Sequence, residues 1–492
     1  MPWTHDRLFP SRRGQTIAVG RESVVRFAEC VADSSVAAGR DVGSSLPWPL
    51  LGMTVQGRVP GEALQTLVVR RTLRLQPGAQ TPSAQRNVTS SPIDSDAHPH
   101  RWRALLLIPL AELLGMGVWF SASAASPRLQ ELWGLSASEA GWLTGIVQLG
   151  FVAGTAVAAV LNLADLLPSR WYFAASAVLA AAANAALVVA DGYGTALVLR
   201  FLAGVFLAGV YPPAMKMVAT WFRSARGLAI GTVVGALTVG KATPYLLRAF
   251  PSLGWQEVVL AASAGALAAA VLVGVGYREG PFPFARRPFA WGLIGQVARD
   301  RPVRLAIYGY LGHMFELYAA WTFVSVFFEE FFVSRGYSDA AGQARAGVVA
   351  FAMIGAGGAG SVLAGRWADR LGRERITIWS MAISGCCALS IGWLLRAPVW
   401  LAVAVAVVWG FAVVADSAQF SALVTELAPA HAVGTALTLQ TAIGFLLTSF
   451  SIAAVPHLRD AGGWPLAFGL MAVGPALGIV AMHRLRTSRM GA

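Results

Sequence analysis

The chain has 492 residues, of which 56% are hydrophobic and only 13% are charged, and its formal net charge is +13. Soluble domains carry about 25% charged residues, so this composition excludes an ordinary soluble protein and indicates a membrane protein. The basic excess does not require a nucleic-acid partner, because the arginines concentrate between apolar runs and in the N-terminal region. The three cysteines show neither disulfide nor metal-ligand spacing, and two of them are adjacent at Cys386 and Cys387.

Residues 1–100 differ from the rest of the chain. They mix arginines, acids, prolines and serines, and they contain no apolar run near the roughly 18 residues that indicate a membrane span. No basic segment followed by an apolar one marks a signal peptide. We therefore expect residues 1–100 to form a disordered N-terminal extension, with a small regulatory segment as the alternative.

From Arg101 onward the sequence predicts twelve membrane-spanning helices, each approaching the roughly 20 residues that a helix needs to cross a bilayer. The connection before the last span contains Arg459, Asp460 and Gly462, which favours two spans there over one long helix. The predicted spans are Ala104–Ala124, Ala140–Leu161, Trp171–Ala190, Thr195–Ala219, Gly227–Leu247, Val258–Tyr277, Leu305–Phe328, Ala346–Gly365, Ile376–Leu395, Val399–Leu423, Val433–Val455 and Pro465–Met482.

The arginines predict the orientation. If both termini lie on the same side, most loop arginines fall on that side too, and positively charged loops are typical of the cytoplasmic face. A basic, proline-rich connection over residues 279–304 is the expected cytoplasmic linker. It separates an N-terminal six-helix bundle, residues 101–278, from a C-terminal six-helix bundle, residues 305–492.

An internal repeat supports this division. An offset of 204 residues relates Glu112 to Glu316, Gly154 to Gly358 and Asp165 to Asp369. Two halves that repeat in this way predict an all-α membrane protein made of two pseudo-symmetric six-helix bundles. Glycines along the second and eighth spans predict close approach of neighbouring helices.

The most specific motif lies between the eighth and ninth spans, where Gly365 to Arg375 read G-x-x-x-D-R-x-G-R-x-R. This loop resembles the one that joins the second and third helices in each half of major facilitator superfamily transporters. The fourth span also begins with the family-like pattern R-x-x-x-G at Arg200 and Gly204. The resemblance covers residues 101–492 and implies the two-bundle fold, secondary transport by alternating access, and no cofactor.

By this resemblance we identify a candidate gating loop, formed by Asp165, Gly365, Asp369, Arg370, Gly372 and Arg373. Asp369 is placed to cap the next helix or to meet its positive N-terminal end. Arg373 and Arg366 can bridge to carboxylates or helix C-termini of the other half when the cytoplasmic ends are together. The first-half copy of the loop is degraded, because Pro168 and Ser169 replace its glycine region.

Ionisable residues inside predicted spans are the candidates for a substrate or proton pathway, because each costs about 2.5–3.5 kcal/mol to insert. Glu112, Glu316 and Asp416 could bind a coupling proton or a cationic group, or form structural hydrogen bonds within one half. Arg200 could pair with Glu112 or extend to the outer interface, and Lys241 could anchor an anionic substrate. Further candidates for lining the pathway, with packing as the alternative, are Trp119, Tyr318, Trp321 and Gln440.

The sequence contains no metalloprotease or P-loop motif, so we expect no enzyme activity, no catalytic residues and no ATP-driven transport. His313 and Glu316 lie three residues apart on one helix face, but no second such pair accompanies them, so no metal site is expected.

We expect a multi-pass protein of the cytoplasmic (inner) membrane, monomeric and proton-coupled, acting as a symporter or antiporter for a small molecule. Residues 210–227 are loosely similar to nitrate/nitrite and organic-anion branches, but the second span has no arginine, which disfavours nitrate. A small organic anion is preferred because of Lys241. The alternatives are a proton-coupled exporter of drugs or hydrophobic cations, and a non-transporting receptor or assembly protein on the same scaffold.

Overall fold

The computed structural model describes residues 98, 100–161, 163–222, 226–250, 252–282, 290–429 and 431–490, and the side chains of residues 164, 165, 226 and 227 are not described. The described residues contain helices and no strand. The extension predicted over residues 1–100 therefore lies almost wholly outside the described part, as do residues 283–289 of the linker.

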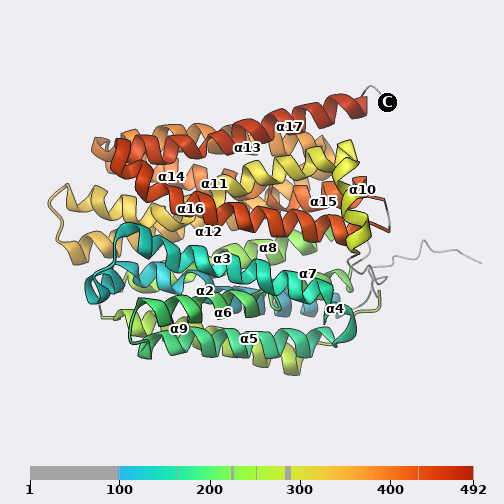
Figure 1. The fold of residues 1–492 in the computed structure, drawn as a ribbon, viewed down its shortest axis with the longest axis horizontal. Helices are drawn as coiled ribbons and strands as arrows, with labels where there is room; N and C mark the ends of the chain where they lie inside the picture. Colours follow the sequence, from blue (N-terminus) through green and yellow to red (C-terminus); the bar gives the residue numbers. More distant parts are fainter. Residues whose placement is uncertain are drawn as a thin grey trace, which may run out of the picture. The chain divides into compact units, whose positions relative to one another are not determined.

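Two helical bundles make up the described chain (Figure 1). The first consists of α2 (Arg101–Trp133), α3 (Ala137–Val160), α4 (Leu163–Leu166), α5 (Ser169–Ala185), η1 (Ala186–Val189), α6 (Tyr193–Leu207), α7 (Tyr211–Ala219), α8 (Arg226–Arg248) and α9 (Trp255–Gly276). A short segment follows, with η2 (Trp291–Leu293) and α10 (Ile294–Arg299). The second consists of α11 (Arg301–Val333), α12 (Asp339–Leu371), α13 (Arg373–Ile391), η3 (Gly392–Arg396), α14 (Val399–Ala415), α15 (Ser417–Leu427), α16 (Val433–Met471) and α17 (Val473–Met490).

Eleven helical stretches in the described chain are long and apolar enough to cross a membrane. The last of them, Val433–Met490, is interrupted at Gly462 and Gly463, which have non-helical backbone angles, with φ of 67° at Gly463. Figure 1 shows α16 and α17 as two separate helices, and α11 packs against both of them, as expected if the chain reverses at these glycines. The prediction of two final spans is confirmed, and the architecture is the predicted one of twelve spans in two bundles.

Local sequence sets the ends of several helices. Gly134, with φ of 63°, ends α2, and Ser136 begins α3 with a capping box in which its hydroxyl and the carboxylate of Glu139 satisfy each other's backbone N–H. Asp300 caps α11 by accepting a hydrogen bond from the backbone N–H of Val303 at 3.1 Å. These caps fix the tight reversal between α2 and α3 and the start of the second bundle.

The fourth span of each bundle is broken. In the first bundle α6 ends at Leu207 and α7 restarts at Tyr211, so Pro212 and Pro213 stand in a first helical turn, where a missing N–H does no harm. In the second bundle the break between α14 and α15 falls at Asp416. Asp416 lies 204 residues after Pro212, so the repeat holds for backbone shape although the residue types differ.

The bundles contact each other mainly through α8 against α12 and α3 against α16. Small residues allow this, because a Cβ added at Gly235 would lie only 3.0 Å from the backbone oxygen of Gly358. We call the end where α2 begins and α17 ends the terminal end, and the end where α2 and α11 finish the opposite end. Figure 1 shows α4, α10 and α15 at the terminal end, near the C-terminus.

Candidate functional site

Arg200 is fully buried in α6 and holds the first bundle together. Its guanidinium donates hydrogen bonds to the backbone oxygens of Val118, at 2.9 Å, and Trp119 in α2, and to the oxygen of Leu143 in α3. It also donates to Oδ1 of Asn184 in α5 at 2.9 Å. Among the described residues no ion pair involves Arg200, so it neither pairs with Glu112 nor reaches the interface. An influence of Arg200 on proton coupling stays a prediction.

Glu112 lies on α2 with no exposed surface, and neither carboxylate oxygen has a hydrogen-bond partner within the described part of the chain. Lys241 on α8 is close enough to act on it electrostatically, although the two do not form an ion pair within 4.0 Å. A buried carboxylate that is left unpaired is rare in folded proteins. Glu112 can therefore bind a proton or a ligand without first giving up hydrogen bonds to the protein.

Lys241 lies inside a box of aromatic rings that comes from both bundles. Its ammonium lies 3.8 Å from the ring centre of Trp119 in α2 and 4.6 Å from that of Tyr318 in α11, and it donates a hydrogen bond to the hydroxyl of Tyr318. The ring of Trp321 lies 5.8 Å away. Aromatic faces stabilise cations at such distances. We call Trp119, Tyr318 and Trp321 the aromatic cage.

Several buried polar atoms, in the cage and on α3 and α16, have no partner among the described residues. The indole N–H groups of Trp119 and Trp321 are both unpaired, as are both amide atoms of Gln148 on α3 and the amide oxygen of Gln440 on α16. Phe151, one helical turn after Gln148, packs against Trp119 with ring centres 5.0 Å apart. Unpaired buried polar groups in a native fold mark places where water, an ion or a ligand belongs.

Of these residues, Trp119, Tyr318, Trp321 and Gln440 are candidates from the sequence, with packing as the alternative, and Gln148 is not among those candidates. The signal for Gln148 was present, since it is an uncharged amide in an otherwise apolar span. Its importance depends on its position opposite the second bundle, and periodicity within α3 alone does not reveal that.

Glu316 on α11 is buried like Glu112, but each of its carboxylate oxygens accepts a hydrogen bond. The indole N–H of Trp409 in α14 donates to Oε1 at 2.7 Å, and the hydroxyl of Ser384 in α13 donates to Oε2 at 2.8 Å. These bonds tie three helices of the second bundle together. The alternative considered from the sequence, a structural hydrogen-bonding role within one half, describes the geometry of Glu316.

Asp416 lies at the break between α14 and α15 and is also buried. Its Oδ1 lies 2.8 Å from Nδ1 of His313 on α11, and Nε2 of the same ring lies 2.9 Å from the hydroxyl of Ser417. The position of His313 was noted from the sequence only as an isolated metal ligand. No group of three or more metal-binding side chains occurs in the described residues.

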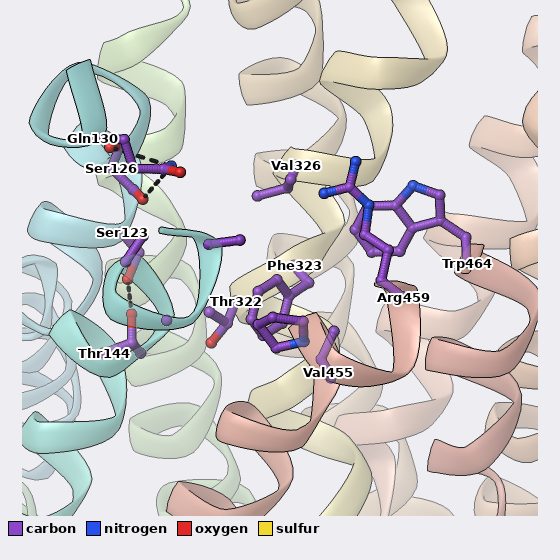
Figure 2. Close-up of a pocket in the computed structure, with 14 residues that line it drawn as sticks. Ser123, Ser126, Gln130, Thr144, Thr322, Phe323, Val326, Val455, Arg459 and Trp464 are labelled. Atoms are coloured by element: carbon purple, nitrogen blue, oxygen red, sulfur yellow. Dashed lines mark hydrogen bonds between the residues drawn. The ribbon is translucent and has the colours of Figure 1, made fainter. Parts of the chain in front are cut away.

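A pocket of about 70 Å³ lies between the bundles toward the opposite end. Figure 2 shows Ser123, Ser126 and Thr144 of the first bundle facing Phe323 and Arg459 of the second. The hydroxyls of Ser123 and Thr144 share a hydrogen bond, so the first-bundle wall is polar. Ring atoms of Phe323 lie 3.4 Å from where a Cβ would stand at Gly141, which narrows the pocket.

Polar links between the bundles occur at mid-depth and toward the opposite end. Arg248 on α8 and Glu329 on α11 form an ion pair at 3.0 Å, and the hydroxyl of Tyr245 donates to the backbone oxygen of Trp321 at 3.1 Å. With Lys241 and Tyr318, these contacts form three successive links along one face of α8. We call them the α8–α11 ladder.

Comparison with known proteins places the chain in a family. The sequence profile described as Major Facilitator Superfamily matches residues 109–452 and, again, residues 346–490. The chain belongs to the Major Facilitator Superfamily. Membership in this superfamily of secondary transporters makes it a multi-pass membrane transporter for a small molecule, and not an enzyme. No curated protein matches the sequence.

The fold also resembles that of a solved superfamily transporter. That structure is a bacterial homologue of the human lysosomal transporter Spinster, in an inward-facing and unoccupied conformation. The TM-score is 0.56 at 17% sequence identity, and the match covers 80% of this chain and 94% of the other. At this identity the similarity shows the fold alone.

The superfamily loop between α12 and α13 is shorter than the motif predicted. Helix α12 continues through Asp369 and Arg370 to Leu371, and Gly372, with φ of 91°, makes the turn into α13 without any side-chain cap. The prediction that Asp369 caps the next helix is therefore wrong, because Asp369 still lies in the preceding one. Gly365 is buried within α12.

Arg373 contacts its own bundle. Its guanidinium donates to Glu426 at 2.7 Å and to Gln419 at 2.8 Å, both on α15, and lies 3.8 Å from Asp369. The prediction that it bridges to the other half does not hold in this conformation. Asp165 lies on α4, but its side chain is outside the described residues.

Proposed function

We propose that this transporter moves a small organic anion together with a proton across the cytoplasmic membrane. In this proposal Lys241 binds the anion, Glu112 carries the proton, and the protein is a monomer with both termini in the cytoplasm. The observation that carries the proposal is the position of Lys241: a buried cation, surrounded by unpaired hydrogen-bond donors, at the contact between the bundles.

The chemistry around Lys241 favours an anion. The ammonium can donate three hydrogen bonds, and Tyr318 accepts one of them. The indole N–H groups of Trp119 and Trp321 add two more donors without partners in the described residues. A carboxylate or sulfonate supplies the acceptors and the negative charge that these groups lack, and the aromatic cage suits an apolar ring.

Glu112 lies near Lys241, so its protonation state affects the binding of an anion there. An ionised Glu112 repels an anion at Lys241 and competes for the same ammonium, whereas a protonated Glu112 does neither. Anion binding should therefore strengthen as the pH falls, and the anion and proton should travel together. Alternating access follows if occupation of Lys241 weakens its link to Tyr318 and loosens the α8–α11 ladder.

The arginine distribution supports the orientation, since the terminal end carries most of the loop arginines and cytoplasmic loops are typically basic. In that orientation the α8–α11 ladder joins the two bundles toward the outer side of the membrane.

A thermal-shift series on the purified protein tests the substrate class. The probes share one aromatic ring and carry a sulfonate, an uncharged amide or an ammonium group. We expect the sulfonate alone to stabilise the protein, more strongly at pH 5.5 than at pH 8, because a sulfonate stays ionised throughout and only protein groups titrate. Lys241→Gln should weaken binding by roughly a hundredfold, the scale of a charged, buried hydrogen bond, and Lys241→Arg by much less.

The second candidate is a proton-coupled exporter of hydrophobic cations. It rests on the aromatic cage, which already holds one ammonium, and on Glu112 beside it. Stabilisation by the ammonium probe that survives in Lys241→Gln would favour this function and exclude the anion. Uptake of the labelled sulfonate into proteoliposomes, driven by an imposed pH gradient, separates transport from a receptor on the same scaffold.

A further inference from the structure

A second cavity, of about 220 Å³, opens at the terminal end and is separate from the site at Lys241. It lies where α2 begins, α7 ends and α9 ends. His100 and Arg103 line it from the start of α2, Trp221 from the end of α7, and Tyr277 and Arg278 from the end of α9. We call it the α2–α9 crevice.

The crevice presents positive charge with no neutralising partner. The side chains of Arg103 and Arg278 are both exposed, and neither guanidinium takes part in an ion pair within the described residues. Glu279 is the acid next to them, and its carboxylate accepts a hydrogen bond from the hydroxyl of Tyr277 at 3.1 Å. Two guanidinium groups that line one cavity, one from the start of α2 and one just after the end of α9, form the arrangement that proteins use for phosphate groups.

The aromatic wall of the crevice is held in place. The indole N–H of Trp221 donates to the backbone oxygen of Arg278 at 3.3 Å, and the hydroxyl of Tyr277 lies 3.3 Å from that of Thr220. Trp and Tyr concentrate at the boundary between lipid and water in membrane proteins. These bonds fix the ends of α7 and α9 to each other, so the cavity does not depend on flexible side chains alone.

Apolar surface continues from the crevice toward the membrane. Leu107 lines its floor, and the neighbouring Leu106 is 72% exposed. On α9, Val275 is 83% exposed beside Gly276, which also lines the cavity. Exposed leucine and valine on a membrane-spanning helix face lipid, so the basic cavity and the lipid-facing surface meet at this point.

We infer that the α2–α9 crevice binds the phosphate headgroup of an anionic membrane lipid. Arg103 and Arg278 hold the phosphate, Trp221 and Tyr277 flank the glycerol region, and the acyl chains follow Leu106 and Val275. A free phosphate ion would use the same arginines but would gain nothing from the apolar surface. The lipid is chosen because the cavity opens where basic and lipid-facing residues adjoin.

Lipid binding to the purified, full-length protein tests this assignment. Native mass spectrometry would compare phosphatidylglycerol with phosphatidylcholine of the same acyl chains, and a competition arm would add inorganic phosphate. We expect phosphatidylglycerol to bind more tightly than phosphatidylcholine. The double variant Arg103→Gln/Arg278→Gln should lose at least about fivefold in phosphatidylglycerol affinity, since each arginine near an anionic membrane contributes on the order of 1 kcal/mol.

The matched control is Arg484→Gln/Arg486→Gln on α17, which removes the same charge near the same end of the protein, away from the crevice. It should leave the affinity unchanged. Equal loss in both double variants would show that only net charge matters and would overturn the site. Equal binding of the two lipids, or complete displacement by millimolar phosphate, would overturn the assignment to a lipid. Because the experiment measures lipid binding, its result does not depend on whether the proposed transport function is correct.

Discussion

Glu112 and Glu316 occupy equivalent positions in the two bundles, 204 residues apart, and both are buried on the first helix of their bundle. Glu316 accepts hydrogen bonds from Trp409 and Ser384, whereas Glu112 has no partner among the described residues. The positions equivalent to Trp409 and Ser384 in the first bundle are Val205 and Ala180, which cannot donate. The repeat therefore preserves the position of the carboxylate but not its hydrogen-bond partners.

The cations show the same asymmetry. Lys241 corresponds to Phe445 in the second bundle, and Arg200 corresponds to Ala404. Phe445 packs against Trp119 with ring centres 5.7 Å apart. Lys241 is thus the cation inside the aromatic cage, whereas its counterpart Phe445 packs against the cage. The carboxylate without a partner and the caged ammonium both lie in the first bundle, whereas Glu316 and Asp416 of the second have partners, which predicts that the first bundle carries the chemistry.

The largest expected difference is between Glu112→Gln and Glu316→Gln. Glutamine in place of Glu112 removes the coupled proton, so accumulation of the labelled sulfonate driven by a pH gradient should fall to the level of empty liposomes. Exchange of the sulfonate without a gradient should persist, and anion binding should no longer depend on pH. Glutamine in place of Glu316 can still accept from Trp409, so accumulation should stay within about twofold of wild type. A comparable loss of accumulation in both variants would contradict the functional difference between Glu112 and Glu316.

Arg200 sharpens the distinction between a buried charge that supports the fold and one that acts on a ligand. Arg200→Met leaves the oxygens of Val118, Trp119 and Leu143 without their donor, which should destabilise the protein by about 3 kcal/mol or more. We expect a lower melting temperature and lower yield, but normal sulfonate affinity per folded molecule. A stable variant with lost affinity would show that Arg200 belongs to the substrate site.

Asp369 tests the loop that carries the superfamily motif. Its exposed carboxylate lies 3.8 Å from Arg373, so Asp369→Asn should cost the fold little, about 0–1 kcal/mol. Arg373 would then lose one of the charges that hold it in its own bundle, and we expect reduced uptake at normal membrane insertion. Uptake at the wild-type rate, at equal expression, would refute a gating role for this residue.

The fold could be predicted from the sequence because membrane spans, loop arginines and a constant repeat offset can all be recognised along the chain, without knowledge of contacts between helices. The final two spans were predicted from Arg459, Asp460 and Gly462 alone, and the break at Gly462 and Gly463 confirms them. The partners of buried charges were not accessible. Arg200 binds backbone oxygens of α2 and α3, and Glu316 binds Trp409 ninety-three residues away. No periodicity or spacing within one helix encodes such contacts between helices.

The aromatic cage is an intermediate case. Lys241, Trp119, Tyr318 and Trp321 were each candidates, but no sequence pattern groups them, because they come from α2, α8 and α11. The motif around Asp369 shows the opposite error, since its turn residues predicted a longer loop than the one that forms at Gly372. Tertiary contacts extend α12 to Leu371, and a local pattern does not contain them.

The smallest expected effect concerns the outermost link of the α8–α11 ladder. Arg248 and Glu329 lie near the opposite end with only 11% and 20% of their side chains exposed, so Arg248→Gln leaves the Glu329 carboxylate largely buried without its cation. The variant should therefore lose up to about 3 kcal/mol of stability and melt at a lower temperature, while its effect on transport stays the smallest of the four. Since the pair exists only while α8 and α11 are together at this end, its loss should still favour opening there.

Labelling measures this shift directly. A cysteine introduced at Ser126, which lines the pocket between the bundles, should react faster with a membrane-impermeant maleimide in Arg248→Gln than in the otherwise wild-type background. The double variant Arg248→Glu/Glu329→Arg restores an ion pair of reversed sign and should return the labelling rate toward its original value. If the reversed pair labels as fast as Arg248→Gln, the ion pair does not hold this end closed, and the ladder consists of Lys241 and Tyr245 alone.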